Sequence, residues 1–378
     1  MQMSLSLTTA RLIWRFRLAW QRLRGQSRAR SMGTLAGFYR QMWQDAADRL
    51  GATMIDLANG FWRVEQGDRS TLIHNYIVQI DDPVTLNLAG DKVLCHQLLA
   101  AHGVRVPDHA AFTLPAIDRA TSFMGRFPGS SFVVKPASGT SGARGVTTHI
   151  TDPGECRRAA ALASLYGSQL LIERWIPGES YRLLFLDGEM IHASRRRGLR
   201  VVGDGRSTVA QLVRAAGPSL DGSGRAWRLD VELTLAAQAL TVDSIIAANR
   251  TVLAQSTRAP ITDSVEIRTV FDEEATALIG PHLRDEAAHA VRIIGSRFAG
   301  VDVITLDPRR SLQETSGVVN EINTTPGLHH HYGLEGAGSQ TPPAVRVLTR
   351  LLGTPDANEI SGAVSEESAC SVLKGGGR

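Results

Sequence analysis

The chain has 378 residues, enough for two or three domains, and its 43% hydrophobic and 21% charged residues are typical of a soluble globular protein. No apolar run approaches the roughly 18 to 20 residues needed to cross a bilayer, so no membrane-spanning helix is expected. The three cysteines are too widely separated for a disulfide framework or a structural zinc site. We therefore expect a cytoplasmic protein.

The net charge of +4 is unevenly distributed, because residues 1–40 contain eight Arg and no acidic residue. Winding positions 11–24 at 100° per residue places their apolar side chains on one arc, with Arg11, Arg15 and Arg22 opposite. This predicts a basic amphipathic helix within an N-terminal segment, 1–35. Such a helix suits an anionic membrane surface, a transit peptide, or packing on its own domain or a second subunit. We favour packing and expect a homodimer, and without a recognition module we expect no nucleic-acid partner.

In chain order, the patterns then predict an α+β protein. We expect a first domain at 36–110, with a helix at 38–50, strands at 53–57 and 73–80, and a helix from an N-cap at Asp91 to Gly103. In 111–177 we expect strands at 131–136 and 146–150 around a glycine-rich loop, a helix at 153–166 and a strand at 169–173. In 178–353 we expect a hairpin at 181–193 turning at Asp187-Gly188, a helix at 285–298, and strands at 301–306 and 318–323. The small polar residues of 354–378 predict a disordered tail.

Nearly all of the basic residues are Arg, and only three are Lys. Lys92 lies in the first turn of a predicted helix, and Lys135 ends an apolar strand just before the loop 138–145. A lysine ammonium is a compact charge suited to phosphate, and the glycines of the loop let backbone N–H groups approach an anion. The loop lacks the Walker pattern. Together these residues predict a phosphate site of another kind.

Two predicted strands carry oxygen ligands. Glu321 and Asn323 point to the same side of one strand, and an antiparallel neighbour can bring Asp302 against them. Two carboxylates and an amide suit Mg²⁺, which completes its coordination with water and phosphate oxygens. The alternative is a solvated outer face of the hairpin. The apolar neighbours of Glu321 favour the metal site.

The strand ending at Trp175-Ile176 offers backbone groups and an apolar wall to a planar base. Arg182 opens the next strand and is a candidate partner for phosphate, and the run Arg195-Arg196-Arg197 is either a solvated stretch or a clamp for phosphate or carboxylate. Of His329, His330 and His331, at most one is expected to contact substrate, because three consecutive side chains do not face one site.

These motifs, in this order, resemble the ATP-grasp superfamily over about residues 91–332. The resemblance rests on the following segments: Asp91-Lys92, Val134-Lys135-Pro136 with its loop, Glu173 to Arg182, Gly300-Val301-Asp302 and Asn320 to Gly327. Tyr181 to Leu184, Arg195 to Arg197 and Gly203 to Thr208 are most similar to the ATP-grasp portion of cyanophycin synthetases, with D-alanine–D-alanine ligases and glutathione synthetases as more distant relatives. No segment of the printed sequence resembles the Mur-ligase-like half of a cyanophycin synthetase.

The resemblance implies an ATP-grasp fold in which two α+β subdomains hold ATP, after a pre-ATP-grasp domain. It implies that ATP contacts Lys92, Lys135, loop residues Ser138, Gly139, Thr140, Ser141 and Gly142, and adenine-side residues Glu173, Arg174, Trp175 and Ile176. The family's ribose carboxylate falls at Ser180 here, with Glu179 one residue earlier, so either is a candidate. Asp302, Glu321 and Asn323 would hold one or two Mg²⁺ ions, and Arg182, Lys135 and Arg196 would act in catalysis.

The function implied is an ATP- and Mg²⁺-dependent carboxylate–amine ligase that forms an amide or peptide bond through an acyl phosphate and releases ADP and phosphate. Amino acids or small peptides are the expected substrates. The alternatives are a small-molecule kinase on the same scaffold and a nucleotide-binding module without catalysis.

Overall fold

The computed structural model describes residues 7–9, 11–12, 15–16, 27–139, 145–196, 200–215, 235, 239–253, 261–262, 272–334, 336 and 341–353. The chain forms two compact units, one of residues 1–32 and 81–338 and the other of 33–80 and 339–378. The segment 36–110 is thus divided between the units, while the domain limits expected from the sequence remain predictions. The expected disordered tail, 354–378, lies outside the described residues.

The smaller unit is a four-stranded antiparallel sheet in the order β1-β2-β3-β4, with two helices. Its elements are α2 (Ser27–Arg49), β1 (Thr53–Asp56), β2 (Phe61–Gln66), β3 (Arg69–His74), β4 (Ile77–Val78) and α11 (Pro343–Leu352). The Trp43 indole of α2 donates a hydrogen bond to the Asn75 carbonyl (2.8 Å), and Arg69 of β3 donates to the Leu352 carbonyl of α11 (3.3 Å). The single strand predicted at 73–80 is therefore wrong: the turn at Asn75, whose φ is +54°, separates β3 from β4.

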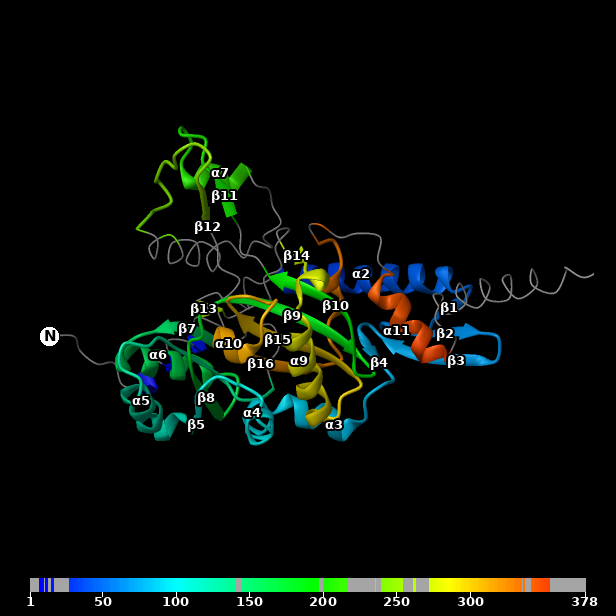
Figure 1. The fold of residues 1–378 in the computed structure, drawn as a ribbon, viewed down its shortest axis with the longest axis horizontal. Helices are drawn as coiled ribbons and strands as arrows, with labels where there is room; N and C mark the ends of the chain where they lie inside the picture. Colours follow the sequence, from blue (N-terminus) through cyan, green and yellow to red (C-terminus); the bar gives the residue numbers. More distant parts are fainter. Residues whose placement is uncertain are drawn as a thin grey trace, which may run out of the picture. The chain divides into compact units, whose positions relative to one another are not determined.

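The first sheet of the larger unit is antiparallel, in the order β13-β7-β6-β8-β5. Its strands are β5 (His109–Thr113), β6 (Phe132–Pro136), β7 (Val146–Ile150), β8 (Gln169–Arg174) and β13 (Ile261–Thr262). Helices α5 (Ile117–Gly125) and α6 (Pro153–Ala163) lie along it (Figure 1) and share an apolar cluster with Phe132 and Val134. Since side chains alternate along β6, Val133 and Lys135 face the other side.

The second sheet has the order β14-β10-β9-β15-β16 and is also antiparallel. Its strands are β9 (Glu179–Leu186), β10 (Glu189–Arg196), β14 (Glu273–Glu274), β15 (Phe298–Thr305) and β16 (Val318–Thr324). Asp187 and Gly188 both have positive φ (48° and 87°), which confirms the predicted hairpin turn. Helix α9 (Pro281–Ile294) packs on one face in a cluster that also includes residues of α3 (Pro83–Gly90) and α4 (Lys92–Ala101).

Two backbone features determine where α4 begins and how the chain enters β9. The Asp91 carboxylate accepts the Val93 and Leu94 N–H groups at 3.1 Å, so Asp91 is the predicted N-cap of α4. The second feature is Gly178, which precedes β9: its φ is +125°, and a Cβ there would lie 2.6 Å from the Thr305 backbone. Only glycine allows the chain to pass that close as it enters β9.

The sequence patterns missed a small part formed by β11 (Arg200–Val202), β12 (Thr251–Leu253) and α7 (Val209–Ala215). It has an apolar cluster of its own, which includes Val201, Val209 and Val252. Near the N-terminus, the described residues 7–9, 11–12 and 15–16 are helical, Leu7 packs against the cluster of α5 and α6, and Arg11 donates to the Ser164 carbonyl at 3.4 Å. Among the described helices, none is long and apolar enough to cross a membrane.

Candidate active site

One face of the second sheet carries the polar residues singled out in the sequence. Across the strands, Arg182 is paired with Asp302, and Asp302 with Glu321. Gly300 is paired with Asn323 one step further along. Directly paired residues point to the same side, so strand pairing gathers these side chains. The opposite face, with Tyr181, Leu183 and Val301, forms the apolar core against α9.

Arg182 and Asp302 form a buried, two-pronged ion pair. Arg182 donates from Nε to Asp302 Oδ1 and from Nη2 to Oδ2, both at 2.7 Å, and their side chains are 8% and 10% exposed. The Asn323 amide also donates to Asp302 Oδ2, at 3.3 Å. A fork-shaped guanidinium matched to a carboxylate is a strong and strongly oriented contact. Arg182 is therefore held in one position on this face.

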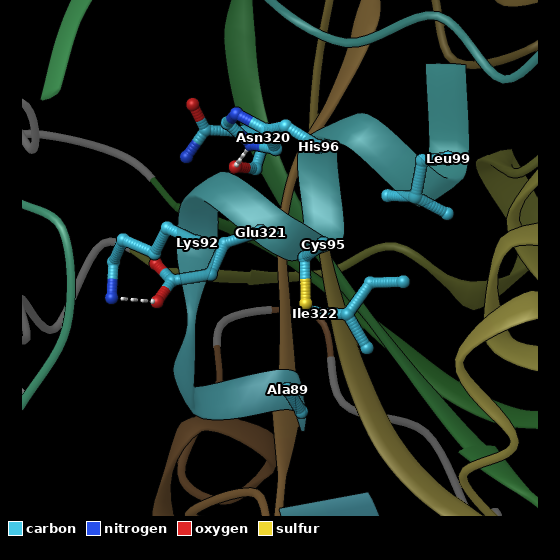
Figure 2. A pocket seen from close by; sticks show the side chains of 8 residues that line it. All are labelled: Ala89, Lys92, Cys95, His96, Leu99, Asn320, Glu321 and Ile322. Atoms are coloured by element: carbon cyan, nitrogen blue, oxygen red, sulfur yellow. Dashed lines mark hydrogen bonds and ion pairs between the residues drawn. The ribbon is translucent and has the colours of Figure 1, made fainter. Parts of the chain in front are cut away.

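Lys92 reaches the same face from the first turn of α4. Its Nζ lies 2.9 Å from Glu321 Oε1, and Figure 2 shows the two side chains facing each other. Glu321 raises the pKa of Lys92, against the effect of burial. Burial acts to raise the pKa of Glu321, but the charges of Lys92, Lys135 and Arg182 outweigh it and lower that pKa to about 2. Both groups are therefore charged at neutral pH.

Lys135 forms the second lysine pair, on the first sheet. Its Nζ lies 2.7 Å from Glu173 Oε1 on β8, and their side chains are 7% and 3% exposed. Val133 is the direct partner of Glu173 across the strands, which places Lys135 and Glu173 on the face turned away from α5 and α6. The sheet thus presents one buried cation and one buried carboxylate on this side.

His96 joins the two lysine pairs and was not predicted. Its Nε2 donates to the Asn320 carbonyl of β16 (3.0 Å), as Figure 2 shows, and its Nδ1 lies 3.7 Å from Glu173 Oε1. Burial lowers the pKa of His96 to about 4, although Glu173 acts to raise it. The signal available in the sequence was spacing: His96 is four residues after Lys92, on the same side of a helix.

The start of the glycine-rich loop is attached to α4. The Lys92 N–H donates to the Ala137 carbonyl at 3.1 Å, and Asp91 and Ser138 form an isolated β-bridge. Gly139 follows with φ +71°. Thr140, Ser141 and Gly142 lie outside the described residues, as does Arg197. The structure therefore places Lys92, Lys135 and the first residues of the loop together.

In the segment expected to contact adenine, two backbone N–H groups are already hydrogen-bonded within the protein. The Arg174 N–H donates to the Asp108 carbonyl and the Trp175 N–H to the Ser131 carbonyl, both at 2.8 Å. The Arg174 guanidinium lies over the Phe127 ring, on the side of the sheet that α5 and α6 cover. Ile176 is buried against Ile304. A base bound here would therefore meet the apolar wall, whereas the Arg174 and Trp175 N–H groups are already engaged.

The two ribose candidates lie on opposite faces of β9. Glu179 is on the side of Tyr181, and its carboxylate forms ion pairs with Arg195 (2.5 Å) and Arg200 (3.5 Å). Ser180 is on the side of Arg182, paired across the strands with Arg196 of β10. Strand alternation thus separates Glu179 from the polar face and keeps Ser180 and Arg196 on it.

The polar face fits a hard divalent cation. Asp302, Glu321 and Asn323 supply two carboxylates and an amide, the oxygen donors that Mg²⁺ takes. Each carboxylate is paired with a cation, Asp302 with Arg182 and Glu321 with Lys92. Within the described part of the chain, no group of three or more His, Cys, Asp or Glu side chains is arranged to hold a metal ion. A set with two acids must therefore complete its ligands from elsewhere.

No family model matches the chain. It is 29% identical over 255 residues to a cyanophycin synthetase of Nostoc sp., covering 65% of this chain and 27% of that protein. It is 27% identical over 306 residues to the glutathione biosynthesis bifunctional protein GshAB of Listeria welshimeri, covering 77% of this chain and 38% of that protein. The chain therefore spans between about a quarter and two fifths of the length of these relatives.

Among solved structures, the chain is similar to a bifunctional glutathione synthetase from Pasteurella multocida, with a TM-score of 0.56 and 22% identity. The match covers 83% of this chain and 43% of that one. The α+β ATP-grasp fold predicted from the sequence is confirmed, and so is the resemblance to ATP-grasp ligases, including cyanophycin synthetase and glutathione synthetase.

Proposed function

We propose that this chain is an ATP- and Mg²⁺-dependent ligase that joins a carboxylate to an amine, through an acyl phosphate, and releases ADP and phosphate. The observation that carries the proposal is that α4 contacts both sheets. Its Lys92 pairs with Glu321 of the second sheet, and its His96 lies 3.7 Å from Glu173, the partner of Lys135 in the first. Amino acids or small peptides are the proposed substrates, and the similarity to a cyanophycin synthetase and a GshAB protein supports this class.

Nucleotide binding would exchange partners within this cluster. Phosphate oxygens would replace the carboxylates of Glu321 and Glu173 as partners of Lys92 and Lys135, because a lysine ammonium is a compact charge that suits phosphate. Asp302, Glu321 and Asn323 would then hold Mg²⁺, which, when bound, neutralises charge on the phosphates. Glu321 thus has a cation before and after the exchange, Lys92 first and Mg²⁺ afterwards. This avoids leaving the Glu321 carboxylate unpaired at either stage.

Arg182 and Arg196 are proposed to act on the carboxylate that is activated. They extend from neighbouring strands on the polar face, and Asp302 holds Arg182 in place. A fixed guanidinium stabilises negative charge where it develops, on the transferring phosphoryl group and then on the tetrahedral intermediate. Ser180 is the proposed ribose contact, because it shares this face.

The test is product analysis with ATP, Mg²⁺ and a panel of amino acids, offered singly and in pairs. We expect ADP and phosphate, formed in proportion to a new amide. Arg182→Met should abolish product formation, whereas Arg297→Met, in an exposed pair with Asp187, should not. Release of AMP would contradict an acyl-phosphate route, and a stable phosphorylated product formed without an amine would identify a kinase.

A further inference from the structure

Three acid–base side chains outside the lysine cluster form a buried chain. Glu274 Oε1 lies 3.9 Å from His192 Nε2, and His192 Nδ1 lies 3.0 Å from His331 Nδ1. The two histidines are 5% and 4% exposed. The other ring nitrogen of His331, Nε2, is buried and has no hydrogen-bond partner among the described residues. Buried polar atoms are nearly always paired, so an orphaned nitrogen calls for an explanation.

The buried series Glu274–His192–His331 lies beside Arg182. On β10, His192 and Ser194 point to the same side, and Ser194 is paired across the strands with Arg182. His331 ends the short helix η3 (Leu328–His331), a few residues after the end of the strand that carries Glu321 and Asn323. The Arg182 charge acts on His331. His331 therefore adjoins the polar face on which the carboxylate would be activated.

The contacts select one arrangement of protons. In a pair of neutral histidines joined through Nδ1, one ring must donate and the other accept. The Glu274 carboxylate is too far from His192 Nε2 for a good hydrogen bond, but it favours a proton on that nitrogen. His192 then accepts through Nδ1, so His331 donates from its own Nδ1. This leaves His331 Nε2 without a proton and with its lone pair available.

We propose that His331 is the proton acceptor for the amine that attacks the acyl phosphate, and that Glu274 and His192 are positioning residues that fix its tautomer. This proposal rests on the ligase function proposed above. The amine binds as the free base, and its lone pair forms the C–N bond. The nitrogen becomes cationic and passes one proton to His331 Nε2. The tetrahedral intermediate then collapses, the C–O bond to phosphate breaks, and the proton moves from His331 to the departing phosphate.

The surroundings keep His331 ready to accept. Burial lowers the pKa of His331 well below its ordinary value, and the neighbouring His192, His330, Arg182 and His329 lower it further. The ring is therefore neutral at physiological pH, and its acceptor nitrogen is not already protonated. The positive charge of Arg182 also disfavours binding of the amine in its ammonium form. As the C–N bond forms, the nitrogen loses basicity, and transfer to a weak base becomes favourable.

The tautomer is tested without turnover. In protein labelled with ¹⁵N-histidine, long-range ¹H–¹⁵N correlation spectra at pH 7.5 should show His331 protonated on Nδ1 and His192 protonated on Nε2. The His331 signals are assigned by their loss in His331→Asn. Glu274→Gln should shift the His192 protonation pattern. A proton on His331 Nε2 in the wild-type protein would overturn the proposal.

The proton-transfer role is tested by comparing two nucleophiles in His331→Asn, which keeps a donor near the Nδ1 position and removes Nε2. With the productive amine, we expect a loss of about 10²- to 10⁴-fold in turnover, the usual contribution of a general base. With hydroxylamine, which is weakly basic, hydroxamate formation should fall less than about 10-fold. The same substitution at the exposed His289 of α9 is the matched control and should change neither rate.

The outcomes separate the two proposals. An equal loss with both nucleophiles in His331→Asn would overturn the role of His331 and leave the ligase function standing. Absence of hydroxamate from the wild-type protein with every acid tested would refute the ligase function, and with it the proton-acceptor role. If His331→Asn does not fold, Glu274→Gln replaces it, and its amine reaction should fall more than its hydroxamate reaction.

Discussion

Arg182 of β9 and Asp302 of β15 share two hydrogen bonds of 2.7 Å in a place where about nine tenths of each side chain is buried. The pair joins the central strand β9 to its neighbour β15 on the polar face of the sheet. Removal of one partner leaves the other charge without compensation, while removal of both does not. Comparing single and double variants of this pair therefore tests its role in folding separately from its role in the reaction.

The first prediction concerns stability at this pair. Arg182→Met should lower the free energy of unfolding by about 3 to 5 kcal/mol, because Asp302 stays buried and unpaired. The double variant Arg182→Met/Asp302→Leu should recover much of that loss and remain inactive. Urea denaturation measures both. The control is Arg297→Met in an exposed ion pair, which should cost less than about 1 kcal/mol. A double variant no more stable than the single one would contradict the argument.

The second prediction concerns nucleotide affinity. Lys135→Met should weaken ATP binding about 10- to 100-fold, since a charge-assisted hydrogen bond contributes roughly 1.5 to 3 kcal/mol. Isothermal titration calorimetry with ATP and Mg²⁺ measures the change. Arg119→Met, at an exposed position on α5, which packs on the same sheet as Lys135, is the control and should bind normally. Unchanged affinity in Lys135→Met would argue that the nucleotide lies elsewhere.

The third prediction follows from the buried His96. Its pKa is lowered to about 4 in the folded protein, against an ordinary value of 6.5. The unfolded chain binds the proton more readily within this window, so stability should fall as the pH drops from 6.5 to 4, by up to about 3 kcal/mol. His96→Gln keeps a donor for the Asn320 carbonyl and cannot titrate, so its stability should depend less on pH there. Urea denaturation at pH 7, 5.5 and 4.5 compares the two. Parallel curves would refute the assignment.

The fourth prediction concerns Glu321, whose pKa is lowered to about 2 from 4.5. Here the folded protein holds the ionised form more strongly, so the stabilisation is present above pH 4.5 and is lost as the pH falls toward 2. Glu321→Gln should lose less stability between pH 4.5 and 3 than the wild type. At neutral pH the same variant should need more Mg²⁺ for turnover, which a Mg²⁺ titration measures. An unaltered Mg²⁺ requirement would remove Glu321 from the metal site.

Much of the fold could be predicted because local signals agreed with long-range pairing. Asp91 capped α4 as expected, and Asp187-Gly188 turned the hairpin. Alternation along β16 placed Glu321 and Asn323 on one side, and an antiparallel β15 brought Asp302 beside them. These features depend on neighbours in sequence or on a period of two. The ligand roles of these residues, the ribose contact and the domain limits remain predictions.

The rest could not be predicted, because it depends on contacts between distant segments. His192 and His331 are 139 positions apart and meet only after the sheet and η3 are assembled. Spacing placed His96 on the same side of α4 as Lys92, but its partners, Glu173 and Asn320, come from two different sheets and could not be predicted. The part around β11 and α7 was missed since its strands are three residues long and give little periodic signal.

The second sheet has one charged face and one apolar face, and this division has an evolutionary consequence. Under the proposed function, substitutions at Ser180, Arg196 or Asn323 would change contacts on the polar face without touching Leu183, Val301 or the helix packed behind them. If the proposed function holds, specificity would change through a few strand positions while the packed face stays the same. Related proteins with this sheet would then accept different substrates with little loss of folding stability.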